Sequence, residues 1–222
     1  MHRPISHDPQ PIRLFKSDFL EFFTHIHPAV VVIIWLPVAL IFLGYGVFEA
    51  TSRTTWFQIP LGFGLGLFLW SLAEYTLHRF VFHFRPRTPF QERVIFLFHG
   101  IHHAQPQCKT RLVMPPIVSI PLAFIFYGLF WLILSQLFSA PHWLGPTFAG
   151  FITGYLSYDL IHYATHHFPM RRGIWKALKR HHMQHHYKTP DQRFGVSSPL
   201  WDYIFGTQGK EKGRDNTSPL HG

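Results

Sequence analysis

Histidine is the residue type with which this sequence can do most chemistry. Twelve of its 18 histidines fall into four tight clusters, which are His78 and His83; His99, His102 and His103; His162, His166 and His167; and His181, His182, His185 and His186. Imidazole is the commonest metal-binding side chain, and residues three or four apart share one face of a helix. The clusters therefore predict a polynuclear metal centre built from neutral imidazoles.

The spacing i, i+3, i+4 occurs twice, in the triplet His99, His102 and His103 and in the triplet His182, His185 and His186. On a helix the three members of such a triplet can all face one way. His162 and His166 are one helical turn apart. His78 and His83 would be about 140° apart on an ideal helix. We expect this last pair to hold the site from a bend or from either side.

Ten of the clustered histidines have good ligand spacing, whereas His167 and His181 only adjoin the clusters. Ten nitrogens are too many for one ion. They suit two ions with five nitrogen ligands each, or two ions with fewer ligands and open coordination positions. All-nitrogen sites accept iron, copper, nickel or zinc, and a structural zinc site usually includes cysteine, of which the chain has one, Cys108. Two redox-active irons would account for the number of ligands; copper is an alternative, and zinc can occupy the same site in a preparation.

Acidic residues stand where they can orient these imidazoles by accepting their second N–H. Glu74 precedes His78 by four residues, Asp159 precedes His162 by three, and Asp202 follows the last cluster at a distance. For Glu74 and Asp159 the alternative is simple polarity at a helix end.

Long uncharged runs must position the clusters. Residues 28–48, 58–73 and 112–158 carry no charge, and charged residues make up 14% of the chain against about 25% in typical soluble domains. A membrane-spanning helix needs about 20 apolar residues. We predict spans near 28–48, 57–77, 116–137 and 144–162, with buried helices of a soluble α protein as the alternative. Residues 1–27 carry Asp8, Asp18 and Glu21 and do not read as a secretory signal.

The basic residues indicate sidedness. Residues 84–112 hold five Lys or Arg and residues 168–193 hold seven, whereas the connectors 49–56 and 138–143 hold only Arg53. By the positive-inside rule, both termini and both basic regions are cytoplasmic. All four histidine clusters then meet on that side. We therefore predict an all-α integral membrane protein with four transmembrane helices and a cytoplasmic helical cap that carries the dimetal site.

The residues around the clusters resemble those of the membrane fatty acid hydroxylase/sterol desaturase superfamily, and most closely the fatty acid 2-hydroxylases. The similar segments are Glu-Tyr-Thr-Leu-His-Arg-Phe-Val-Phe-His at 74–83, His-Gly-Ile-His-His at 99–103, Arg-Leu-Val-Met-Pro-Pro at 111–116, the histidines with their neighbours at 158–167 and 179–186, and the run from Phe194 to Thr207. The resemblance covers roughly residues 70–207. The histidine spacing indicates the superfamily; the segments at 111–116 and 197–203 favour the 2-hydroxylases over the sterol enzymes.

The resemblance implies a di-iron oxygenase that uses O2 to hydroxylate a long acyl chain at C2. It also implies ten ligands, namely His78, His83, His99, His102, His103, His162, His166, His182, His185 and His186. Many eukaryotic relatives carry an N-terminal cytochrome b5-type domain, but only about 27 residues precede the first predicted span here. We therefore expect a separate cytochrome b5-like or ferredoxin-like electron carrier, and a bacterial inner membrane as the location.

Three residues are candidates for substrate binding. Arg111 can hold a carboxylate or headgroup at the interface, and Tyr158 and Tyr163 can line the mouth of the pocket; snorkelling of the arginine and interfacial packing of the tyrosines are the alternatives. The predicted domain covers residues 28–207, followed by a polar tail, 208–222. The formal charge of +9 fits attraction to anionic lipids, and nucleic-acid binding is not expected. The rival functions are hydroxylation or desaturation of a sterol or carotenoid, and a non-enzymatic metal or haem protein.

Overall fold

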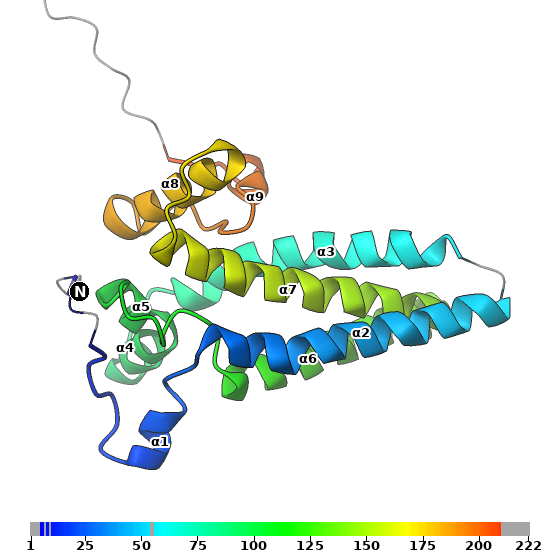
Figure 1. Ribbon diagram of the computed structural model, residues 1–222, viewed down its shortest axis with the longest axis horizontal. Coiled ribbons are helices and arrows are strands. Elements are labelled where there is room, and N and C mark those ends of the chain that lie inside the picture. The colour runs from blue at the N-terminus through cyan, green and yellow to red at the C-terminus, as the bar shows by residue number, and fades with distance from the viewer. Residues whose placement is uncertain (1–4, 7, 9, 54–55, 210–222) are drawn as a thin grey trace, which may run out of the picture.

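The computed structural model describes residues 5–6, 8, 10–53 and 56–209, and every regular element in these ranges is helical (Figure 1). This confirms the prediction of an all-α fold. The predicted tail, 208–222, lies outside the described residues from 210 onward, as do positions 1–4, 7 and 9 of the predicted N-terminal segment.

Four long helical segments form an elongated bundle. They are α2 (Pro28–Arg53), α3 (Gln58–Thr76), α6 (Pro116–Phe130) with its π-helical continuation η3 (Trp131–Leu137), and α7 (Leu144–His167), which follows the 3-10 turn η4 (Pro141–Trp143). The helix α7 packs against both α2 and α3 and is buried along most of its length. The bundle core is aromatic: Trp70 makes ring contacts with Phe151, Tyr155 and Tyr158.

Two glycines allow α3 and α7 to touch backbone to backbone. A Cβ at Gly66 would lie 2.0 Å from the carbonyl oxygen of Thr147, and a Cβ at Gly150 would lie 2.1 Å from that of Phe63. Small residues at a helix crossing permit this close approach, as in membrane helix pairs.

Two of the four predicted spans are long and apolar enough to cross a membrane, Pro28–Ser52 and Pro116–Leu137. Both expose large apolar side chains, such as Ile33 and Ile41 on α2 and Phe124 on α6. The helices α2 and α7 each extend five residues beyond the predicted ends at 48 and 162. In α7 the extra turn carries His166, so one helix continues from the bundle into the region of the histidines.

The remaining elements gather at one end of the bundle and form a cap (Figure 1). They are α1 (Asp18–Phe22), the π-helical turns η1 (Leu77–Phe82) and η2 (Phe96–Gly100), α4 (Pro89–Ile95), α5 (Ile101–Ala104), α8 (Gly173–Tyr187) and α9 (Leu200–Ile204). All four histidine clusters lie at this end.

Candidate metal centre

The ten well-spaced histidines come together as two groups of five. The first group is His78, His83, His99, His103 and His185, and the second group is His102, His162, His166, His182 and His186. Within each group the available ring nitrogens all lie within 4.8 Å of one another, so each group can hold one metal ion. The first group is built on η1, η2, α5 and α8, and the second on α5, α7 and α8.

The spacing allowed all three members of each triplet to face one way. The structure instead divides each triplet between the two groups. In each triplet the i and i+4 residues join one group and the i+3 residue joins the other. His99 and His103 thus belong to the first group, and His102 belongs to the second. In α8 the assignment is reversed, because His182 and His186 belong to the second group and His185 to the first. Because i+3 and i+4 positions lie on opposite sides of position i on a helix, a triplet held between two sites divides in this way.

His78 and His83 share a group because the helix is not an ideal α-helix between them. The element η1 is π-helical, and the backbone N–H of His83 donates to the carbonyl of His78 at 3.0 Å. In a π-turn this i to i+5 bond closes one turn, so residues five apart lie on one face. The separation of about 140° belongs to an ideal α-helix and does not apply to this π-turn, in which the ring centroids of the pair are 5.0 Å apart.

The ring nitrogens are arranged as a bound cation would require. Nε2 of His185 lies 3.0 Å from Nε2 of His83 and 3.2 Å from Nε2 of His103. His185 directs its Nδ1 to the carbonyl of Gln192 at 2.7 Å, and His78 directs its Nδ1 to the carbonyl of Phe194. A neutral imidazole that donates from Nδ1 carries a lone pair on Nε2. These lone pairs therefore point inward, which fits a metal ion.

Burial keeps the cap imidazoles neutral. It lowers the pKa of His78 to about 4, although the hydrogen bond that His78 donates to the Phe194 carbonyl acts in the opposite direction. Burial, followed by the neighbouring imidazoles, also holds the pKa values of His99, His103 and His185 well below their usual range. Neutral imidazole is the form that binds metal.

The acidic residues hold loops and helix ends near the centre. The Glu74 carboxylate accepts the backbone N–H groups of Val196 and Ser197 at 2.6 and 2.8 Å, and both Asp159 oxygens lie 3.3 Å from the N–H of Met114. Among the described residues neither carboxylate has a hydrogen bond to an imidazole, which differs from the partner role considered from sequence. The orienting groups are instead the carbonyls of Gln192 and Phe194, which no side-chain pattern could have indicated.

Asp202 and the two adjoining histidines have other places. Asp202 is fully buried and accepts from the N–H groups of Phe194 and Gly195 at 2.9 and 2.8 Å, and His181 contacts it at 3.0 Å. Burial disfavours the charged form of Asp202, but these hydrogen bonds outweigh it and lower its pKa. His167 packs on the ring of Tyr163. His167 and His181 belong to neither group.

A cavity of about 360 Å³ adjoins both groups. His99 of the first group and His102 and His162 of the second are on its wall, together with Arg111 and Tyr158. Most of the other lining residues are apolar. Of the three residues considered for substrate binding, Arg111 and Tyr158 are on the cavity wall and Tyr163 is not.

A helical bundle whose cap brings ten imidazoles into two adjacent groups, each able to hold a metal ion, is typical of a metalloprotein. Comparison with known proteins gives the family. The sequence profile described as fatty acid hydroxylase matches residues 63–207. The chain therefore belongs to the fatty acid hydroxylase family, as the sequence resemblance indicated.

Its relatives align with most of this chain. Dihydroceramide fatty acyl 2-hydroxylase FAH1 of Arabidopsis thaliana is 37% identical over 93% of this chain and 84% of its own length. Fatty acid 2-hydroxylase of Homo sapiens is 36% identical over 96% of this chain, which spans 60% of the human protein. The solved structure of full-length scs7p, in which only the hydroxylase domain is visible, has a TM-score of 0.78 and 38% identity, covering 87% of this chain and 70% of that one.

Proposed function

We propose that this protein is an integral membrane oxygenase that hydroxylates a long acyl chain at C2, with one iron ion in each histidine group. The observation that carries the proposal is the apolar cavity whose wall includes histidines of both groups. An acyl chain in that cavity lies against both metal positions. The names of the plant and human relatives, dihydroceramide fatty acyl 2-hydroxylase and fatty acid 2-hydroxylase, support this choice of substrate and position.

The ten histidines would hold the ions, and two bound irons would supply the activation of O2 and the redox chemistry that oxidation of a C–H bond requires. The chain's own residues bind the substrate and exclude water. Leu97, Ile101 and Leu112 line the cavity with apolar surface, which favours an alkyl chain over water. Tyr158 packs against the ring of His162 with centroids 5.7 Å apart and closes the wall beside the second group.

We further propose four membrane spans with the cap on the cytoplasmic side. The helices α3 and α7 would be the two additional spans, and they pack against α2, which meets the length and apolarity required of a span. Exposed Leu61 and Phe68 on α3 support contact with lipid. The exposed basic side chains at 85, 87, 93, 171, 172 and 176 all belong to the cap region, which agrees with a cytoplasmic cap in an inner membrane.

The proposed oxidation consumes electrons, and we propose that a carrier of the cytochrome b5-like or ferredoxin-like kind supplies them. Arg171, Arg172 and Lys176 near the start of α8 are exposed, and none makes an ion pair with a described residue. The same helix carries three of the ten histidines. A carrier with acidic surface residues therefore suits this side of the cap.

The test combines lipid mass spectrometry with metal analysis. Cells that express the chain are expected to accumulate 2-hydroxy acyl lipids, and His182→Ala is expected to abolish them, because His182 is fully buried in the second group. His142→Ala is the matched control, since His142 lies in η4 at the opposite end of the bundle. A changed sterol or carotenoid without any 2-hydroxy acid, or full activity in His182→Ala, would contradict the proposal.

A further inference from the structure

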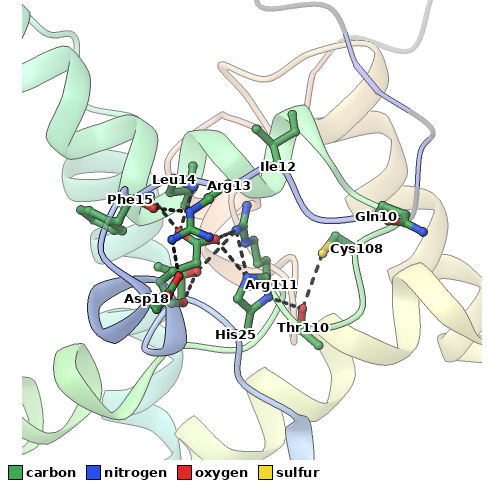
Figure 2. A network of polar contacts seen from close by, with 12 residues as sticks. Gln10, Ile12, Arg13, Leu14, Phe15, Asp18, His25, Cys108, Thr110 and Arg111 are labelled. Carbon is green, nitrogen blue, oxygen red and sulfur yellow. Dashed lines mark hydrogen bonds and ion pairs between the residues drawn. The ribbon is translucent and has the colours of Figure 1, made fainter.

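The segment before α2, residues 10–25, forms a strap along one wall of the cavity. Five residues of the strap line the cavity, namely Leu14, Phe15, Leu20, Phe23 and Thr24. Arg111 ties the strap to the cap, since its Nη2 donates to Oε1 of Glu21 at 2.7 Å and lies 3.2 Å from Nε2 of His25 (Figure 2). The side chain of Arg111 is only 2% exposed, so this contact is shielded from water. The strap, which the family profile does not match, therefore completes the cavity.

The mouth of the cavity has an apolar rim. Of the described residues that line the cavity, three are exposed: Leu20 of the strap, Phe98 of η2 and Ile117 of α6, by 46, 52 and 62%. A residue that lines a cavity and is also exposed marks where that cavity opens. These three residues come from three separate segments and are all apolar, so the opening favours contact with an alkyl chain over contact with water.

The mouth lies at one end of a helix that can span a membrane. The helix α6 with η3 is long and apolar enough to do so, and Ile117 belongs to its first turn. Ile120 and Phe124 are 39% and 73% exposed, and they follow Ile117 at i+3 and i+7. Residues with this spacing share one face of a helix. An exposed apolar face of α6 therefore leads from the interior of the span to the mouth.

The outer side of the strap is apolar as well. Phe19 and Phe22 of α1 are each 71% exposed. The strap leads into α2, which is the other candidate span. Aromatic side chains concentrate at the interface between membrane and water, and basic side chains such as the exposed Arg13 and Lys16 favour anionic headgroups. The strap thus has the composition of a segment that lies at a membrane surface.

We propose that the cavity opens sideways into the cytoplasmic leaflet through a portal between Leu20, Phe98 and Ile117, and that the acyl tail of the substrate stays in the lipid along α6. This proposal rests on the proposed function and adds the route by which the chain reaches the metal positions. The portal leads into the same cavity of about 360 Å³ that His99 and His162 line. Because the tail stays outside the cavity, the portal residues select for an alkyl chain without measuring its length.

The test places a removable plug in the portal of the metal-loaded protein in lipid nanodiscs. Cys108, the one cysteine of the chain, is buried, so a thiol reagent reacts at an introduced cysteine. Benzyl methanethiosulfonate adds a benzyl group to Leu20→Cys or Ile117→Cys, and dithiothreitol removes it. Ser17→Cys is the matched control, since Ser17 is an exposed strap residue that does not line the cavity and makes no side-chain capping hydrogen bond.

The probe is an N-hexadecanoyl lipid in the same bilayer, with a photoreactive diazirine at C4 of the acyl chain. Mass spectrometry measures its attachment to peptides that contain Leu97 or Leu112 of the cavity wall. A plug at either rim position is expected to lower this labelling at least about tenfold, because the added group overfills the opening. Labelling is expected to return when the plug is reduced, which shows that the variants are folded. The plug in Ser17→Cys is expected to change nothing.

A second measurement asks whether the rim meets lipid. A nitroxide at Leu20→Cys or Ile117→Cys is expected to be more accessible to oxygen, which concentrates in lipid, than to a water-soluble nickel complex. A nitroxide at Asp191→Cys, in place of an exposed acidic residue of the cap, is expected to show the reverse. Unchanged labelling with both plugs, or rim nitroxides that meet the nickel complex more than oxygen, would overturn the portal. If the probe enters through the portal but no 2-hydroxy product forms, the proposed function fails and the portal stands.

Discussion

The two histidine groups differ in how their imidazoles are oriented. In the first group, His78 and His185 direct Nδ1 to the carbonyls of Phe194 and Gln192. In the second group the Nδ1 atoms of His102, His166, His182 and His186 are buried without a hydrogen-bond partner in the described part of the chain. Partners of this kind fix the ring and raise ligand basicity. One loop, residues 188–199, therefore orients two of the five imidazoles of the first group, those of His78 and His185.

Asp202 connects that loop to metal binding at the first group. In Asp202→Ala the N–H groups of Phe194 and Gly195 lose their acceptor, and the Phe194 carbonyl that orients His78 is released. We expect a loss of about 2–4 kcal/mol in the free energy of unfolding, from unsatisfied buried donors. We also expect bound metal to fall by roughly half, since disturbing an orienting partner weakens affinity about 10–100-fold. Metal analysis after dialysis measures the second effect.

The matched control is His181→Phe. It removes a half-buried partner of the same carboxylate but leaves both backbone donors satisfied. Its metal content is expected to equal that of the wild type. Full metal content in Asp202→Ala would show that the loop does not govern the first group.

At the scale of the elements, the sequence predicted the helical fold and the ten histidines but not their division. The span predicted near 116–137 from its lack of charge has the same bounds as α6 and η3 taken together. Ideal helical geometry could not predict the π-turn at Leu77–Phe82, which brings His83 back to His78, because its i to i+5 hydrogen bond depends on the tertiary position of both rings. The backbone acceptors at 192 and 194 were also beyond prediction, since any residue type has a carbonyl.

The crossing of α3 and α7 gives a prediction with an internal control. In Gly66→Ala the added Cβ would meet the backbone of Thr147 and Phe151 at 2.0 and 2.6 Å, so the helices must separate. We expect a loss of about 1–3 kcal/mol, typical of overpacking, and a lower Tm in detergent. A Cβ at Gly64, on the same helix, would meet nothing within 4 Å. Gly64→Ala is therefore expected to be neutral or to stabilise by up to about 1 kcal/mol; equal Tm values for the two variants would contradict the close crossing.

At the scale of the whole molecule, the bundle and the cap are held together by different forces. The bundle is joined by apolar packing along α2, α3 and α7. In the cap, neutral imidazoles from four segments between His78 and His186 pack against one another. Ligand groups of this kind are stabilised by the metal that they bind, because metal binding is coupled to folding. Removing the metal should therefore weaken the cap and spare the bundle.

This difference predicts an acid transition confined to the cap. Burial lowers the pKa of His78 from 6.5 to about 4, and those of His99, His103 and His185 move in the same direction. A lowered folded-state pKa means that the unfolded chain binds more protons, so this stability is fully present above pH 6.5 and is lost as the pH falls through about 4. In metal-free protein, hydrogen exchange is expected to rise over this window in 173–204 but not in α3 or in the part of α7 that precedes His162. Bound metal competes with protons for the same nitrogens, so it is expected to move the transition to lower pH; a cap equally stable at pH 7 and 4 without metal would show that the imidazoles are not buried as neutral groups.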